Sequence, residues 1–165
     1  MSSPETTLRS RAPERRSMTT EEIGTLLNTL LEAERAGAAV LTAFIHQVEL
    51  GARARAEMRR IQRDESHNCG VLIRLLDSLG IERSRLTGDF LYKALAVKGA
   101  VPRLQFLNRG QAWVERRIAE AVPRIADAHV RRALEAMRIS HVANIAACEA
   151  LVTGAPASGA TSNGA

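Results

Sequence analysis

The sequence predicts an all-α protein with four long helices, and three observations carry this prediction. The chain has 165 residues, which is enough for one domain with a sizeable core and short for two. Hydrophobic residues make up 45% of it and aromatic residues only 3%, a composition that favours helix over strand. Apolar residues also recur at three- and four-residue intervals along four segments, which is the spacing of amphipathic helices.

The first helix is expected to begin at Thr19, because Glu22 three residues later completes a capping box. Its inward stripe includes Glu34, since steps of about 100° per residue place this carboxylate among apolar side chains. The apolar members of the stripe are Ile23, Leu27, Leu30, Ala38, Leu41, Ile45 and Val48. Gly37, one turn after Glu34, leaves room for another helix or an ion to approach closely. Gly51 is expected to follow the end of this helix.

The second helix is expected to end near Leu79, and its inward stripe includes Glu65, with Asn68 at the edge. The other members of the stripe are Met58, Ile61, Cys69, Leu72, Leu76 and Leu79. Asp64 and His67 have a spacing typical of metal ligands, but His67 lies about 200° from the stripe. We therefore expect Asp64 and His67 on the surface.

A connection of about twenty residues leads from Gly80 to Val101 and is expected to contain a short helix after Asp89. A connection this long is uncommon unless it has a structural task, and crossing the length of a bundle is such a task. The third helix is expected to begin near Pro102, a residue suited to a first turn. Pro123 should kink or end it.

The third and fourth helices also carry polar residues on their inward stripes. The third has Gln111 and Glu115 there, and the fourth has His141, with Arg138 and Asn144 about 60° to either side. Their apolar members are Leu104, Leu107, Ile118, Val122 and Ile125 on the third helix, and Val130, Leu134, Met137, Ile145, Cys148 and Val152 on the fourth.

These inward polar residues are expected to meet at one level of the bundle. If the first two helices fold about a turn near residue 50, Glu34 faces a position beside Glu65. If the other two fold about residue 126, Gln111 faces His141. A polar group in a helical core costs several kcal/mol unless it is satisfied. The pattern therefore indicates a shared site, either a metal site or a buried polar network.

With these features the chain resembles the ferritin-like superfamily over about residues 19 to 152. More narrowly, four runs resemble small bacterial ferritin-like proteins described only as a domain of unknown function. The runs are Leu-Leu-Glu-Ala-Glu-Arg-Ala-Gly (30–37), Arg-Asp-Glu (63–65), Phe-Leu-Asn-Arg-Gly-Gln-Ala-Trp (106–113) and Ser-His (140–141). The resemblance implies a ferritin-like four-helix bundle with two antiparallel pairs joined by a long crossover. It also implies a di-metal site built from glutamates and Glu-x-x-His motifs.

Matched residue by residue to this resemblance, Glu34 takes the place of the carboxylate of the first helix. Glu65 takes the place of the glutamate in the motif of the second. On the third helix Glu115 matches the expected carboxylate, although Gln111 is better centred on the stripe. On the fourth helix His141 matches the histidine of the motif.

Two positions depart from the pattern that the resemblance implies. Asn68 stands where a histidine is expected, and Arg138 stands where a glutamate is expected. Three interpretations therefore stay open. The first is a metal-free network in which Arg138 supplies the positive charge beside Glu65 or Glu34. The second is a mononuclear or reduced iron or manganese site held by Glu34, Glu65 and His141, and the third is a complete dinuclear site.

Two classes of function follow from these interpretations. One is a metal-dependent oxidoreductase or metal-handling protein, and the other is a non-enzymatic scaffold or binding module. Cys69, one turn from Glu65, is interpreted as a small core hydrophobe rather than a ligand. The sequence shows no nucleophile–base pairing, phosphate-binding glycine loop or zinc-type spacing of cysteine and histidine. Nothing in it marks a substrate pocket.

The formal net charge of +5 is spread over predicted outer faces, which indicates a solvated basic surface rather than a nucleic-acid site. Cys69 and Cys148 fall on inward stripes of separate segments, so we expect reduced thiols and a cytoplasmic protein. No stretch is apolar enough to span a bilayer, and no secretory signal opens the chain. We expect disordered tails at 1–18 and 153–165.

A homodimer is the partner that the sequence suggests. Leu26, Phe44 and Leu75 lie near the edges of their stripes, where they would widen an apolar outer surface.

Overall fold

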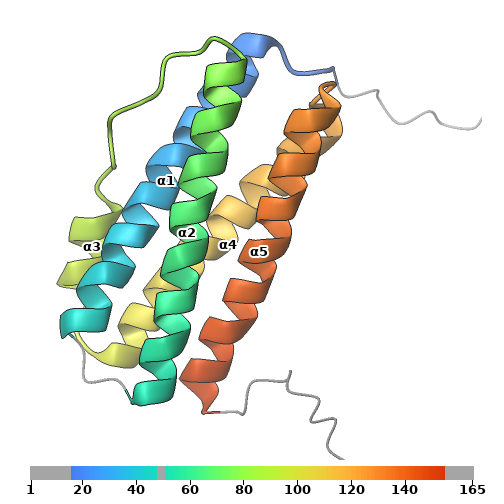
Figure 1. The fold of residues 1–165 in the computed structure, drawn as a ribbon. Coiled ribbons are helices and arrows are strands. Elements are labelled where there is room, and N and C mark those ends of the chain that lie inside the picture. The colour runs from blue at the N-terminus through green and yellow to red at the C-terminus, as the bar shows by residue number, and fades with distance from the viewer. Residues whose placement is uncertain (1–15, 48–50, 155–165) are drawn as a thin grey trace, which may run out of the picture.

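The computed structural model describes residues 16–47 and 51–154, and the structural statements below concern these residues. They form an all-α fold in which four long helices pack in pairs (Figure 1). The elements are α1 (Thr20–Gln47), α2 (Ala52–Ser78), the short α3 (Phe90–Ala96), α4 (Ala100–Ala121), the 3-10 turn η1 (Val122–Arg124) and α5 (Ala128–Thr153). The predicted number, order and type of the long helices are confirmed, as is the short helix between the second and the third.

The two pairs are α1 with α2 and α4 with α5, and the helices of each pair run antiparallel (Figure 1). Because α2 and α4 run in the same direction, the chain has to return along the bundle between them. Residues 79–89 make this return beside α1, and α3 then packs against α1 and α4 (Figure 1). The crossover is therefore axial, since it crosses the length of the bundle as the long connection predicted.

The outer face of α1 holds the crossover in place. The side chain of Asn28 donates to the Glu82 carbonyl oxygen at 2.9 Å and accepts from the Ser84 N–H at 2.7 Å. Arg35 also donates to the Ser84 carbonyl oxygen, at 2.5 Å. These bonds fix the path of the crossover, so α3 is delivered to a defined place beside α1.

The helix ends have local causes in the sequence. The predicted capping box is present, since the Thr19 Oγ1 accepts the Glu22 N–H at 3.2 Å and the Glu22 Oε2 accepts the Thr19 N–H at 2.7 Å. Gly80 follows α2 with φ at +66°, a conformation that favours glycine. Pro123 ends α4 in a 3-10 turn, and the carboxylate of Asp127 caps α5 by accepting two backbone N–H groups.

Polar side chains divide the apolar core into two clusters. One cluster includes Leu30, Leu72 and Ile118, and the other includes Leu41 and Ile61. On every long helix the polar residues lie between the stretches that supply the two clusters. The buried polar and charged residues are Glu34, Glu65, Asn68, Gln111, His141 and Asn144.

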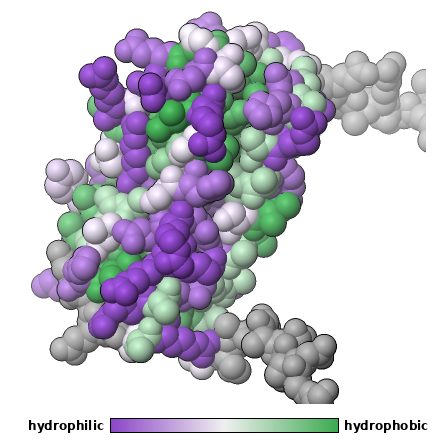
Figure 2. Space-filling view, viewed as in Figure 1, coloured by the Kyte–Doolittle hydropathy of each residue, from purple (hydrophilic) through white to green (hydrophobic). Residues whose placement is uncertain are grey.

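The three apolar residues expected to widen an outer surface for a homodimer are instead buried. Leu26, Phe44 and Leu75 are 6%, 1% and 1% exposed and belong to the core of the chain itself, so they do not widen an outer surface. The view in Figure 2 is mostly hydrophilic, with several smaller hydrophobic areas, one of them over α5, the helix that carries the exposed Ile139 and Val142.

Most of the predicted tails, 1–18 and 153–165, and the predicted stripe member Val48 lie outside the described residues. The end of the first tail is described, and there the Met18 N–H donates to the Arg124 carbonyl oxygen at 2.8 Å. In the described ranges, no helix combines the length and the hydropathy that a membrane crossing requires.

Candidate functional site

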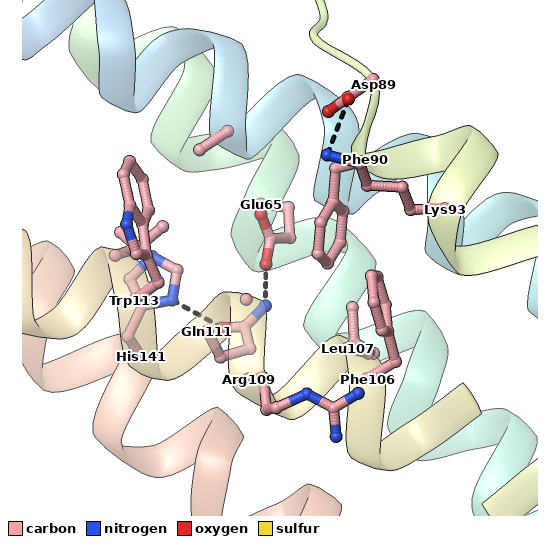
Figure 3. Close-up of a pocket in the computed structure, with 14 residues that line it drawn as sticks. Glu65, Asp89, Phe90, Lys93, Phe106, Leu107, Arg109, Gln111, Trp113 and His141 are labelled. Atoms are coloured by element: carbon pink, nitrogen blue, oxygen red, sulfur yellow. Dashed lines mark hydrogen bonds and ion pairs between the residues drawn. The ribbon is translucent and has the colours of Figure 1, made fainter. Parts of the chain in front are cut away.

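A hydrogen-bonded network at mid-bundle joins all four long helices. The Glu34 carboxylate on α1 accepts from the Asn68 amide of α2 at 3.0 Å and contacts His141 Nε2 of α5 at 2.7 Å. The carboxyl group of Glu65, also on α2, hydrogen-bonds to that of Glu34. Gln111 on α4 completes the network, because its amide nitrogen donates to Glu65 and its oxygen lies 2.5 Å from His141 Nδ1 (Figure 3).

The geometry of these bonds fixes how many hydrogens the network holds. With the Gln111 amide nitrogen donating to Glu65, the Gln111 oxygen needs a hydrogen from His141 Nδ1. The contact between Glu34 and His141 Nε2 needs a second hydrogen, and the contact between the two carboxyls needs a third. The network is then neutral, either as two carboxylic acids with a neutral imidazole or as one acid and one carboxylate with an imidazolium.

Burial shifts the pKa values of Glu34, Glu65 and His141 so that each side chain favours its uncharged form. It raises the pKa of Glu34 to about 7 and, together with the nearby Glu34 charge, raises the pKa of Glu65 well above its ordinary value. Burial also lowers the pKa of His141. All three shifts disfavour charge at this level of the bundle, which agrees with the neutral network required by the hydrogen bonds.

A pocket of about 550 Å³ opens between α1, α3 and α4 and reaches the network. Glu65, Gln111 and His141 line its inner end, as does Gly37. A Cβ atom added to Gly37 would lie only 2.6 Å from Glu65 Oε2, so the glycine that the sequence singled out allows the carboxyl group to lie against α1. The network is therefore a buried site that this pocket reaches from the side of α1, α3 and α4.

Aromatic side chains form much of the pocket wall. Phe90 of α3 stacks on Phe106 of α4, with ring centroids 4.9 Å apart, and Trp113 lines the pocket about two turns further along α4 (Figure 3). The Trp113 side chain is 39% exposed. Asp89, Lys93 and Arg109 supply the other charged groups of the lining.

Glu115 and Arg138, both expected at the site, lie outside the network. The Arg138 guanidinium contacts the Glu115 carboxylate at 2.9 Å and the Glu135 carboxylate, three residues earlier on α5, at 2.6 Å. These side chains are 20% to 40% exposed. The interpretation in which Arg138 supplies a positive charge to Glu34 or Glu65 is therefore wrong.

Asn144, expected around the site, has a different partner, whereas Cys69 lies beside the network. The buried Asn144 Oδ1 accepts from Arg60 at 3.1 Å, and its Nδ2 has no partner among the described residues. Cys69 is half-buried beside the network, and burial, with the charges of Glu34 and Glu65, raises the pKa of its thiol to about 11. This thiol stays protonated at neutral pH, which does not favour it as a metal ligand.

The residues implied by the resemblance do not fit a metal ion in their present arrangement. Their ligand atoms bond to one another, to Asn68 and to Gln111 rather than facing a shared point. Within the described ranges, no group of three histidine, cysteine, aspartate or glutamate side chains is placed to hold an ion. The resemblance placed Glu34, Glu65 and His141 at one level, and they do meet there, but as hydrogen-bond partners.

Sequence reasoning missed the pocket and the bond between Asn68 and Glu34. The run from Phe106 to Trp113 contained a signal for the pocket, because it places two aromatic residues beside Gly110 on the helix that faces the crossover. A Cβ atom added to Gly110 would lie 2.7 Å from the Phe90 ring, so this glycine allows α3 to approach α4.

Comparison with known proteins shows a family and gives no activity. No curated protein and no solved structure matches the chain. Residues 21–150 match the model of a family described as "Domain of unknown function (DUF6306)", a span that includes the four long helices almost completely and every residue of the network. The chain therefore belongs to the DUF6306 family.

Proposed function

We propose that this domain is a metal-free bundle of the ferritin-like type that acts as a binding module, with protons in the place of metal ions. The observation that carries the proposal is the closed hydrogen bonding of Glu34, Glu65 and His141 to one another and to Asn68 and Gln111. A buried polar network is favourable only when each member is satisfied. Three hydrogens achieve this here without another charge.

The competing function is the iron- or manganese-dependent oxidoreductase or metal-handling protein. One observation favours it, namely that Glu34, Glu65 and His141 are neighbours and Arg138 points elsewhere. A divalent ion that displaced the two acidic protons would leave the total charge of the network unchanged. It would also have to break the bonds that the three side chains make to one another, which counts against this function.

Elemental analysis of the full chain, purified without chelators, tests the proposal alongside the variant His141→Ala. We expect no stoichiometric iron or manganese in either protein. The variant should lose about 1–3 kcal/mol of unfolding free energy, because it removes the buried hydrogen-bond partner of Glu34 Oε1 and of Gln111 Oε1. His129→Ala is the matched control, since His129 is exposed on the same helix. Stoichiometric metal in the wild-type protein that disappears in His141→Ala would contradict the proposal.

A further inference from the structure

The pocket beside the network has the size and lining of a small-molecule site. Its volume of about 550 Å³ lies within the range of roughly 300–1,000 Å³ that is usual for such sites. Leu107 and Val114 add aliphatic surface to the aromatic side chains of Phe90, Phe106 and Trp113. Because aromatic faces favour stacked and edge-on contacts with flat groups, this lining favours a planar apolar body.

The charged side chains that line the pocket favour an anionic ligand. Lys93 is paired with Asp89 at 2.7 Å, so those two charges offset each other. The guanidinium of Arg109 lies over the Phe106 ring at 5.2 Å, and within the described ranges it has no carboxylate partner. Its planar donors match a carboxylate in two-point contact. The lining therefore has one positive charge that an anionic ligand can neutralise.

The inner end of the pocket sets the orientation of such a ligand. Glu65, Gln111 and His141 hydrogen-bond to one another and to Glu34, and the neutral network supplies no counter-charge. A charged group buried there without a partner would be costly. The uncharged end of the ligand should therefore point inward, with its anionic group held near Arg109 in the outer part of the lining (Figure 3).

We propose that the pocket binds a small planar monocarboxylate, with its apolar body among Phe90, Phe106 and Trp113 and its carboxylate on Arg109. This assignment names the ligand class of the binding module and so rests on the proposed function. A phosphoester of higher charge fits less well, since only one cation of the lining is without an acidic partner in the described ranges.

Calorimetric titration of the full chain with trans-cinnamate and with its neutral analogue trans-cinnamamide tests this assignment. Trp113 is the single tryptophan of the chain, so its fluorescence gives a second readout located in the pocket. We expect cinnamate to bind with saturation, to change this fluorescence, and to bind more tightly than cinnamamide. No saturable cinnamate binding, or equal affinity for the two molecules, would overturn the proposal.

Two variants and a control locate the site. Arg109→Gln should weaken cinnamate binding about tenfold and leave cinnamamide nearly unchanged, because only the charged contact is removed. Arg116→Gln is the matched control, since Arg116 is exposed on the same helix and does not line the pocket. Ala33→Leu should weaken the binding of both cinnamate and cinnamamide, because the larger side chain would fill the pocket from α1. Unchanged cinnamate affinity in Arg109→Gln would overturn the proposal.

The results separate this assignment from the proposed function. A protein without bound metal that fails to bind cinnamate would overturn the ligand assignment alone. A protein with stoichiometric metal that is lost in His141→Ala would overturn the proposed function whatever the titrations give.

Discussion

Glu65 is the residue that connects the buried network to the pocket. Its carboxyl group hydrogen-bonds to Glu34 and accepts from Gln111, and it also lines the inner end of the pocket. As a carboxylic acid it donates to Glu34, but as a carboxylate it would face a second carboxylate in a buried position. The protonation of this one side chain therefore decides whether the network stays satisfied.

The stability of the protein should fall as the pH rises above about 6.5. In the unfolded chain both carboxyls titrate near 4.5, whereas burial raises the pKa of Glu34 to about 7 and that of Glu65 well above 4.5. The folded protein thus holds protons that the unfolded chain has lost, so stability decreases as pH rises through the folded pKa values. Because burial lowers the pKa of His141, this residue makes the protein more stable as the pH rises. This contribution ends near 6.5, the ordinary pKa of histidine.

Urea denaturation between pH 6.5 and 9 measures this decrease, which we expect to be on the order of 1–3 kcal/mol. The variant Glu65→Gln should show a shallower decrease, because its amide keeps the acceptor for Gln111 and a donor for Glu34 without titrating. Glu120→Gln, an exposed change on α4, should run parallel to the wild-type protein. A flat wild-type curve, or equal slopes for Glu65→Gln and the wild type, would contradict the neutral network.

At the level of elements, the pairing of α1 with α2 depends on a close approach at Gly37. Gly37→Ala should destabilise the protein by about 1–3 kcal/mol, because the new methyl group would displace the Glu65 carboxyl from its partners. Gly70→Ala on α2 is the control, since its Cβ atom would meet only Arg74, at 3.4 Å. That change should stabilise by about 0.5–1 kcal/mol through helix propensity. Thermal denaturation gives both values, and stabilisation by Gly37→Ala would contradict this account.

Helix positions and the inward direction of the polar residues could be predicted from the sequence, because both follow from local spacing. Glu34, Glu65, Gln111 and His141 are all buried as their stripes indicated. The partner of Arg138 could not be predicted in this way. A residue about 60° from the centre of a stripe can turn toward the core or toward a neighbouring helix, and Glu135 lies three residues away on its own helix.

The pocket could not be predicted from helical periodicity, because residues of several separate elements line it. Ala33 comes from α1, Phe90 from α3 and Phe106 from α4. Their proximity depends on the axial path of the crossover and on the space left at Gly110. Periodicity within one helix carries no information on how a crossover places its short helix against two others.

At the level of the whole molecule, the homodimer stays a prediction. Exposed apolar residues on α5 form the surface through which two copies of the chain would pair. Ile139 and Val142 are 59% and 48% exposed and lie three residues apart on that helix, on the same side. Light scattering at micromolar concentration should give twice the chain mass of 17.9 kDa. The variant Val142→Lys should shift the protein toward the monomer. A wild-type protein of monomeric mass would show the prediction to be wrong.

The mid-bundle network also has a consequence for how the helices can slide. Leucine-rich surfaces of one helix pack almost equally well after a shift of one turn, about 5.4 Å along the axis. Such a shift of α1, α2, α4 or α5 would separate Glu34, Glu65, Gln111 or His141 from partners that lie within hydrogen-bonding distance. Each long helix contributes at least one member. The network therefore sets the axial register of the whole bundle, as a single buried polar residue does in a coiled coil.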